Sequence, residues 1–229
     1  RLNLYQRSAV GVALFSRFVL LPTPLLPAIR WAIIGACFLV GGWMILTWAI
    51  QCWRSERYSP GAHDNASGVG VLLALAQFLA EHPPRYYCPV FLFTDAEEIG
   101  LDGARAYAAQ ANPAHTLVIN VDQVGAGEQL RLVTRDGTLF PRRTDRRLNA
   151  VIRQSCPEIK DLANTRRSGD YLPFLQAGFA TASLEMTGSA RARAAYHTGS
   201  DNLEIIEEEA LGIVGRTLVS AVELLDEEL

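Results

Sequence analysis

The most extended hydrophobic pattern of the 229-residue chain lies near its N-terminus. Residues 31–50 contain no charged side chain. At about 1.5 Å rise per residue, a helix of this length spans roughly 30 Å, the hydrocarbon thickness of a bilayer. Trp31, Trp48 and Trp53 lie near its ends, where membrane proteins concentrate aromatic residues. The pattern predicts a membrane-spanning helix, and a buried core helix is the alternative.

A second apolar run covers Tyr5–Leu21 and is interrupted by Arg7 and Arg17. Three prolines within residues 22–27 exclude a regular helix directly after it. We therefore expect a helix, a proline-rich turn and a second helix, which together form a transmembrane helical hairpin over residues 1–57. An interfacial helix is the alternative for the first run. This prediction makes the protein an integral membrane protein with the lipid bilayer as a partner.

Residues 58–229 alternate between short apolar runs and helical periodicity, which predicts an α/β three-layer sandwich around a mostly parallel mixed sheet. Ligands of such sheets gather beyond the carboxyl ends of the strands. Strands are predicted at Val90–Thr94, Leu117–Asp122, Leu130–Thr134 and Ala180–Glu185. Helices are predicted at Ser67–His82, Leu101–Ala111, Thr144–Cys156, Tyr171–Ala177 and Glu207–Leu225.

The charge is divided unevenly between these two parts. Residues 1–57 carry six arginines against one glutamate, whereas residues 58–229 carry fifteen basic and twenty-three acidic side chains. An acidic domain argues against nucleic acid as a partner. The four cysteines show no paired metal-ligand spacing. Because more arginines flank the base of the predicted hairpin than its tip, the positive-inside bias favours a cytoplasmic catalytic domain.

Two pairs of arginines, Arg142-Arg143 and Arg146-Arg147, stand close together in the acidic part. The pattern is typical of a solvated loop and helix start. A contact with anionic lipid headgroups is the alternative.

Four segments place chemically active side chains at the predicted strand ends. Glu97 and Glu98 follow the first strand, and Asp122 closes the second. Asp64 lies just before the first helix, and His197 follows the last strand on a loop. Because carboxyl ends of parallel strands share one edge of a sheet, we expect these residues to converge there.

Carboxylate and imidazole groups are the usual ligands of Zn²⁺ in hydrolytic sites that keep a position open for water. Two metal ions about 3.5–4 Å apart can share a bridging carboxylate and a bridging hydroxide. The adjacent Glu97 and Glu98 suit a division of roles, in which one binds metal and the other takes a proton from water. Each residue taken alone has another explanation. Glu97 and Glu98 also fit a solvated helix start, Asp122 a turn, and His197 a surface position. For His63 we favour either a position next to the metal ligands, without binding the metal itself, or a role in shaping the loop.

Together these segments resemble the zinc-dependent exopeptidase family of bacterial leucyl aminopeptidases, glutamate carboxypeptidase and glutaminyl cyclase. The resemblance covers about residues 58–205. Its strongest part is Pro-Gly-Ala-His-Asp-Asn-Ala-Ser-Gly at residues 60–68, which is similar to the family signature around the bridging aspartate. It also includes Glu97-Glu98 followed by Ile-Gly-Leu-Asp-Gly, Tyr-His-Thr at residues 196–198 with Asp201, and Ser-Gly-Asp at residues 168–170.

The resemblance assigns a role to each candidate residue. It implies that Asp64 bridges two zinc ions and that Glu98 and His197 complete the site of one of them. It implies that Asp122 binds the other ion and that Glu97 is the general base. It further implies a cis peptide bond after Asp64 and a substrate pocket near residues 168–170.

The chain departs from the family in one ligand, a histidine in a His-x-Asp segment that precedes the signature. No histidine occurs before His63. We therefore expect that strand to lie upstream of Arg1, with residues 1–57 inserted between it and the signature. Residues 58–229 are then the C-terminal portion of the zinc peptidase catalytic domain, and this chain alone is one zinc ligand short.

The sequence thus predicts a membrane-anchored di-zinc metallo-exopeptidase, in the first place an aminopeptidase. Peptide bonds would be hydrolysed by a metal-bridging hydroxide with Glu97 as general base. The alternatives are a non-catalytic receptor-like or adaptor module, and glutaminyl cyclase or carboxypeptidase chemistry on the same metals. Substrate specificity, the metal used in the cell, membrane orientation and oligomeric state stay open.

Overall fold

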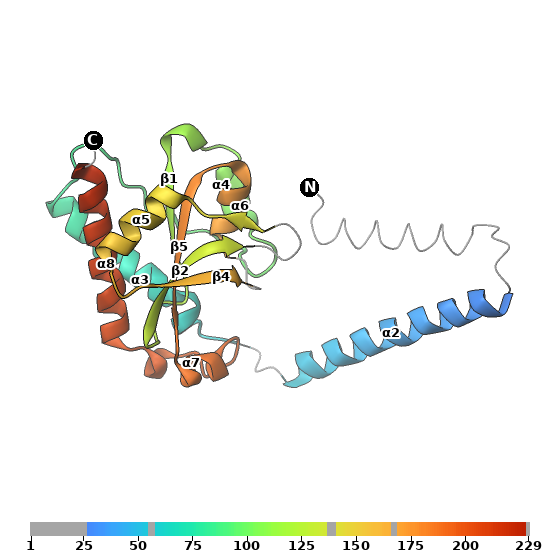
Figure 1. Ribbon diagram of the computed structural model, residues 1–229. Helices are drawn as coiled ribbons and strands as arrows, with labels where there is room; N and C mark the ends of the chain where they lie inside the picture. Colours follow the sequence, from blue (N-terminus) through green and yellow to red (C-terminus); the bar gives the residue numbers. More distant parts are fainter. Residues whose placement is uncertain (1–26, 55–57, 137–140, 166–168, 228–229) are drawn as a thin grey trace. The chain divides into compact units, whose positions relative to one another are not determined.

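The computed structural model describes residues 27–54, 58–136, 141–165 and 169–227. The chain divides into two compact units, Arg1–Arg57 and Tyr58–Leu229. The first unit is described over one helix, α2 (Pro27–Arg54), which begins four residues before the predicted start at Trp31 (Figure 1).

Several large apolar side chains of α2 are exposed, among them Phe38, Leu39 and Trp43. In the part of the chain that the structure describes, no helix combines the length and the apolar character needed to cross a membrane. The prediction of a membrane span at residues 31–50 is therefore not confirmed. The other half of the predicted hairpin, Tyr5–Leu21, lies outside the described residues.

The second unit is built on a mixed β-sheet, which confirms the predicted α/β class. Its strand order is β1 (Leu117–Val121), β5 (Ala180–Thr187), β2 (Gln129–Asp136) and β3 (Arg142–Arg143), and β4 (Lys160–Thr165) also pairs with β2. The pairs β1/β5 and β2/β4 are parallel, whereas β2 runs antiparallel to β5 and to β3.

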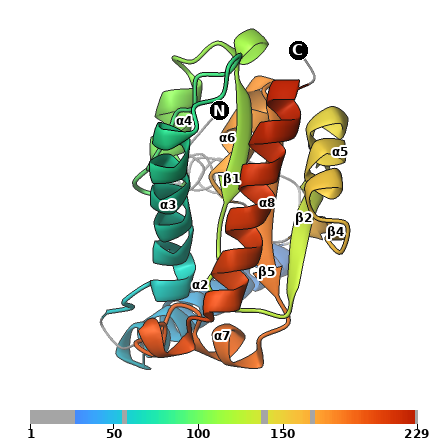
Figure 2. The same cartoon turned by 90° about the vertical axis from the view of Figure 1, so that its left-hand side faces the viewer.

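Helices cover both faces of this sheet (Figures 1 and 2). One face is packed by α3 (Ser67–Glu81), α5 (Arg146–Ser155) and α8 (Glu208–Glu227), which share a large hydrophobic cluster with β1, β2 and β5. The other face is packed by α4 (Asp102–Ala108) and α6 (Tyr171–Ala177). The remaining short elements are η1 (Ala62–Ala66), η2 (Pro113–His115), α7 (Ala190–Ala195) and η3 (Leu203–Ile205).

The apolar spacing of the sequence explains these layers. In α8 the buried side chains recur every three or four residues, as one face of a helix requires, at Ala210, Val214, Leu218, Ala221 and Leu225. In β5 the side chains of Ala182, Leu184 and Met186 join the same hydrophobic cluster. Successive side chains of a strand point to opposite faces, so Thr181 and Ser183 face the other layer.

The predicted strand at Val90–Thr94 is wrong, because this segment is not part of the sheet. Phe91 packs with the α3/α5/α8 cluster, while Leu92 packs with the α4/α6 cluster. Phe91 and Leu92 are partly buried, Val90 and Phe93 are exposed, and the segment has no ladder of backbone hydrogen bonds to the described strands. An apolar run alone does not establish a strand, because a strand also needs a neighbouring strand with which to form backbone hydrogen bonds.

The sequence did not predict β3, β4, α7 or the short helices η1, η2 and η3. Lys160 and Asp161 of β4 are exposed and polar, and both residues of β3 are exposed arginines. Such strands lack the apolar alternation on which the predictions rest.

Candidate metal centre

The edge of the sheet at which β1 and β5 end carries the predicted site residues. Asp122 directly follows β1, and its backbone N–H donates to Leu184 O of β5 at 3.1 Å. Because these two strands are parallel, their carboxyl ends lie side by side. Asp122 therefore lies at the edge of the sheet where the sequence places the candidate site.

Three of the four predicted metal ligands lie within bonding reach of a common ion. His197 Nε2 is 3.2 Å from Asp64 Oδ2 and 2.8 Å from Glu98 Oε1. One ligand atom from each of the three residues lies within 4.8 Å of the others. They come from three separate chain segments, so only the tertiary fold can bring them together.

Asp122 and Glu97 lie in the pocket beside this group. The pocket has a volume of about 390 Å³. It is lined by Asp64, Glu97, Glu98, Gly100, Leu101, Asp122, Gln123, Gly169, Glu185 and Tyr196. The structure thus collects all five predicted site residues in one place, with Asp122 outside the three-residue group.

Negative charge accumulates in this pocket. Burial, together with the charge of Glu98, raises the pKa of Glu97 to about 7. Burial and the charge of Glu98 also raise the pKa of Asp64, against the opposing effect of His197. The pKa of Asp122 is raised well above its usual value by burial and by the charges of Asp64 and Glu185. A cation bound here would offset this repulsion between neighbouring carboxylates.

The loop that carries Asp64 is fixed by hydrogen bonds from both ends. The buried Asp201 carboxylate accepts the backbone N–H of His63 at 2.7 Å and that of Asp64 at 3.2 Å. The Asn65 side chain donates to Val121 O at 2.9 Å and accepts from Gln123 N at 3.2 Å. The peptide bond between Asp64 and Asn65 is cis, as the resemblance implies.

Replacing Asp201 by alanine should weaken both the fold and zinc binding. A hydrogen bond from a backbone N–H to a carboxylate contributes about 1.5–3 kcal/mol to the stability of the fold. The Asp201 carboxylate accepts two such bonds, from His63 and from Asp64. We expect the variant to lose about 2–4 kcal/mol in urea unfolding and about tenfold in zinc affinity.

Asp226→Ala is the matched control for that substitution. The Asp226 carboxylate also accepts two backbone N–H groups, those of Arg85 and Tyr86, each at 2.7 Å. These two hydrogen bonds lie outside the candidate site. The Asp226→Ala protein should therefore be less stable than the parent and bind zinc with unchanged affinity. An equal loss of zinc affinity in both variants would argue against a positioning role for Asp201.

Strained backbone concentrates around the pocket. Within the described residues, the non-glycine positions with positive φ are Ala96, Leu101, Gln123 and His197. His197 itself has φ 57°. Such conformations cost about 1–3 kcal/mol each and persist where the surroundings impose them, which is typical of functional sites.

The other histidines do not join the metal ligands. His63 is buried, burial lowers the pKa of its imidazole, and its backbone rather than its ring serves the loop of Asp64. His82 stacks on Phe78, and His115 ends η2. A role of His63 in shaping the loop of Asp64 stays a prediction.

Sequence reasoning missed Glu185 as a site residue. Its position near the end of β5 places it in the pocket beside Asp122, and only the register of β1 against β5 reveals this. Gly169 also lines the pocket, as expected for residues 168–170. The neighbouring Asp170 accepts a hydrogen bond from Thr94 through Oδ2.

The sequence profile of peptidase family M28 matches residues 49–222, which is more than half of the chain. The chain belongs to peptidase family M28. All five candidate residues lie within the matched range. The expected family resemblance is therefore confirmed.

Relatives of this M28 chain include two curated proteins and a solved structure. Aminopeptidase YwaD from Bacillus subtilis is 28% identical over 181 residues, which cover 73% of this chain and 38% of that protein. The probable lipoprotein aminopeptidase LpqL from Mycobacterium tuberculosis is 28% identical over 203 residues, with 74% and 40% covered. The structure of BSAP, a zinc aminopeptidase from Bacillus subtilis, aligns with a TM-score of 0.59 at 26% identity and covers 73% of this chain and 43% of that one. The chain thus spans about two fifths of the length of these two curated relatives.

Proposed function

We propose that residues 58–229 form the C-terminal portion of the catalytic domain of a zinc-dependent aminopeptidase that uses two metal ions. The observation that carries this proposal is the meeting of Asp64, Glu98 and His197, whose ligand atoms lie within 4.8 Å of one another. Membership of family M28 and similarity to zinc aminopeptidases support it.

The donor set suits zinc. Two carboxylates and one imidazole leave a coordination position open, which is typical of catalytic rather than structural zinc sites. Asp64 would be shared with a second ion that Asp122 holds on the other side. Asp64 and Asp122 line the same pocket, which supports such sharing.

The chain's own residues supply the proton transfers. When bound, zinc would polarise the scissile carbonyl and make a water molecule more acidic. Glu97 lines the same pocket and is proposed not to bind metal, so its carboxylate is free to take a proton from water. It then delivers that proton to the amine that leaves when the peptide bond breaks. A general base with a pKa near neutral pH is suited to both steps.

The charge of the pocket favours an amino-terminal substrate. Among the residues that the structure describes, its lining contains the carboxylates of Asp64, Glu97, Glu98, Asp122 and Glu185 and no lysine or arginine. Such a lining attracts the free α-ammonium group of a peptide. A carboxypeptidase would need a cationic group for the substrate's terminal carboxylate. Comparing leucyl, N-acetyl-leucyl and glutaminyl peptides would separate aminopeptidase from endopeptidase and cyclase chemistry. Absent turnover would favour the adaptor alternative, and turnover that does not depend on zinc would contradict the proposed mechanism.

Zinc should stabilise the folded protein measurably. A ligand present at about 100 times its dissociation constant contributes about 2.7 kcal/mol to the free energy of unfolding, provided it binds only the native state. For a chain of this size we expect Tm to rise by about 5–10 °C on zinc addition and to return after chelation. Scanning fluorimetry checks this. An equal rise in Glu98→Gln protein would place the zinc elsewhere.

We further propose that α2 attaches the protein to a membrane. The exposed apolar side chains of α2 support this, since burying one such side chain in lipid contributes about 1.5–3 kcal/mol. The name of the relative LpqL, a lipoprotein aminopeptidase, agrees with membrane association.

Vesicle flotation tests the attachment. The full chain should float with phosphatidylcholine vesicles, and a variant with Phe38, Leu39 and Trp43 changed to glutamine should float at least tenfold less. The control variant changes exposed apolar residues of the second unit, Tyr86→Gln and Leu203→Gln, and should float like the parent. Equal flotation of both variants would contradict a role for α2.

A further inference from the structure

A second and larger pocket lies at the other end of the strands from the candidate metal centre. Its volume is about 450 Å³, and the walls come from β2, β3, β4 and α5. Asp145 N–H, beside this pocket, donates to Thr181 O at the start of β5, whereas Glu185 near the end of β5 lines the metal pocket. The two pockets are therefore separate.

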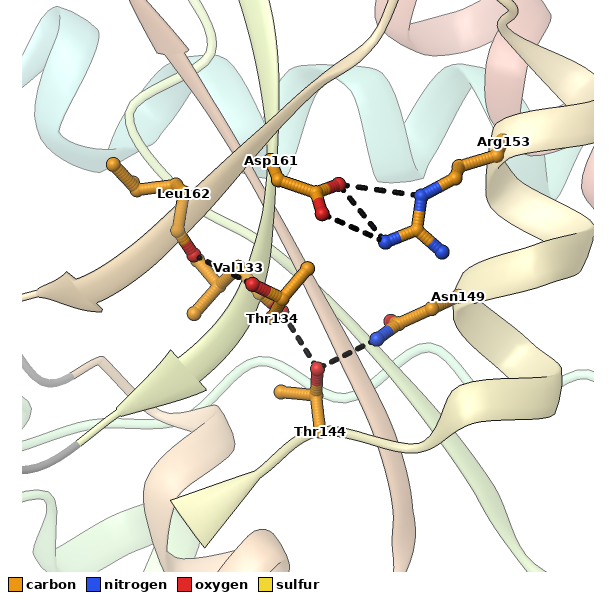
Figure 3. Close-up of polar contacts among 7 residues, drawn as sticks. All are labelled: Val133, Thr134, Thr144, Asn149, Arg153, Asp161 and Leu162. Atoms are coloured by element: carbon orange, nitrogen blue, oxygen red, sulfur yellow. Dashed lines mark hydrogen bonds and ion pairs between the residues drawn. The ribbon is translucent and has the colours of Figure 1, made fainter. Parts of the chain in front are cut away.

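Positive charge dominates this second pocket. Four arginines line it, Arg135 from β2, Arg143 from β3, and Arg146 and Arg153 from α5. Arg153 is neutralised by Asp161, whose Oδ1 and Oδ2 accept from Arg153 Nη2 at 2.9 and 3.1 Å (Figure 3). Among the described residues, no ion pair engages the other three guanidinium groups. The pocket therefore carries a charge excess suited to a multiply charged anion.

The buried Asn149 brings to this pocket a carbonyl oxygen that accepts no hydrogen bond. Its side chain is 4% exposed and lines the pocket. Asn149 Nδ2 donates to Thr144 Oγ1 at 2.8 Å, and Thr144 Oγ1 in turn donates to Val133 O at 2.8 Å (Figure 3). This chain of bonds fixes the orientation of the amide and directs Oδ1 away from Thr144. Oδ1 has no partner within the described residues. A buried acceptor without a donor is unfavourable, and a ligand hydroxyl would satisfy it.

We propose that this pocket binds a small phosphate ester that carries a hydroxyl group near its phosphate. The planar guanidinium groups of Arg135, Arg143 and Arg146 match phosphate oxygens, and the hydroxyl donates to Asn149 Oδ1. A volume of about 450 Å³ lies within the range of small-molecule sites. The site does not depend on the proposed peptidase activity. A free metabolite and a phospholipid headgroup share the required chemistry.

Calorimetric titration of the full chain tests this site with defined probes. Glycerol 3-phosphate carries both groups, methyl phosphate lacks the hydroxyl, and inorganic phosphate lacks the ester. We expect saturable binding of glycerol 3-phosphate that is stronger than that of methyl phosphate. Arg135→Gln and Arg143→Gln should each weaken it about tenfold.

Arg142→Gln is the matched control. Arg142 is the exposed neighbour of Arg143 in β3 and does not line the pocket, so this change removes the same charge at nearly the same place. Binding should stay within about twofold of the parent. Equal weakening by Arg142→Gln and Arg143→Gln, or no saturable binding of any probe, would overturn the proposal.

Vesicles containing phosphatidic acid or a phosphatidylinositol phosphate distinguish the two sources of ligand. If Arg143→Gln reduces vesicle binding relative to Arg142→Gln, and glycerol 3-phosphate competes with it, the ligand is a headgroup. If glycerol 3-phosphate binds and the vesicles show no dependence on Arg143, the ligand is a free phosphate ester. If Arg142→Gln and Arg143→Gln reduce vesicle binding equally, the attraction is unspecific, which would contradict the proposed phosphate-ester site.

Discussion

Peptide hydrolysis is expected to fall by about 10²–10⁴-fold when Glu97 is replaced by glutamine, while zinc binding stays intact. Glutamine keeps the size of the side chain and its place in the pocket, and loses the ability to accept and return a proton. Metal ligation in our account rests on Asp64, Glu98, Asp122 and His197, so Glu97→Gln should leave the zinc content unchanged. Steady-state kinetics of the zinc-loaded enzyme and elemental analysis measure the two effects separately.

Asp102→Asn is a suitable control for this substitution. Asp102 is an acidic residue at the start of α4, five positions from Glu97 in sequence, and its side chain is exposed. Its neutralisation should change kcat by less than about twofold. If Glu97→Gln kept more than a tenth of the parental kcat, the assignment of Glu97 as general base would be wrong.

Zinc affinity is expected to fall by about 100-fold or more when His197 is replaced by alanine. Removing residues that merely orient zinc ligands already costs about 10–100-fold in affinity, so loss of a ligand itself should cost at least as much. The Nε2 atom of His197 lies against both Asp64 and Glu98, and no other histidine joins this group in the described residues. Competition with a chelating dye measures the affinity.

His82→Ala controls for the general effect of losing an imidazole. His82 stacks on Phe78 at the end of α3 and makes no contact with the metal ligands. Its removal should leave zinc affinity unchanged. Equal zinc affinities of His197→Ala and parental protein would contradict the site as described.

Much of the candidate site could be predicted because its residues stand where strands end. Asp122 follows an apolar run that is a strand, and its parallel partner β5 was also visible in the sequence. Glu97 and Glu98 line the pocket although the segment before them forms no strand. Phe91 and Leu92 of that segment pack against the two hydrophobic clusters and so hold the start of the following loop against the fold.

Other features depend on distant contacts that a sequence pattern does not carry. Asp201 was noted only as part of the turn after His197, and its two hydrogen bonds to the loop of Asp64 join residues more than 130 positions apart. The paired arginines were expected to be solvated. In the fold Arg143 lines a pocket while Arg142 does not, because successive side chains of a strand point to opposite faces.

Crystals of the zinc-loaded protein would test the central claim most directly through anomalous scattering at the zinc absorption edge. Our account predicts one peak bound by Asp64, Glu98 and His197, and a second peak that shares Asp64 with Asp122. Zinc bound at other residues, or an absence of anomalous signal between Asp64, Glu98 and His197, would contradict it.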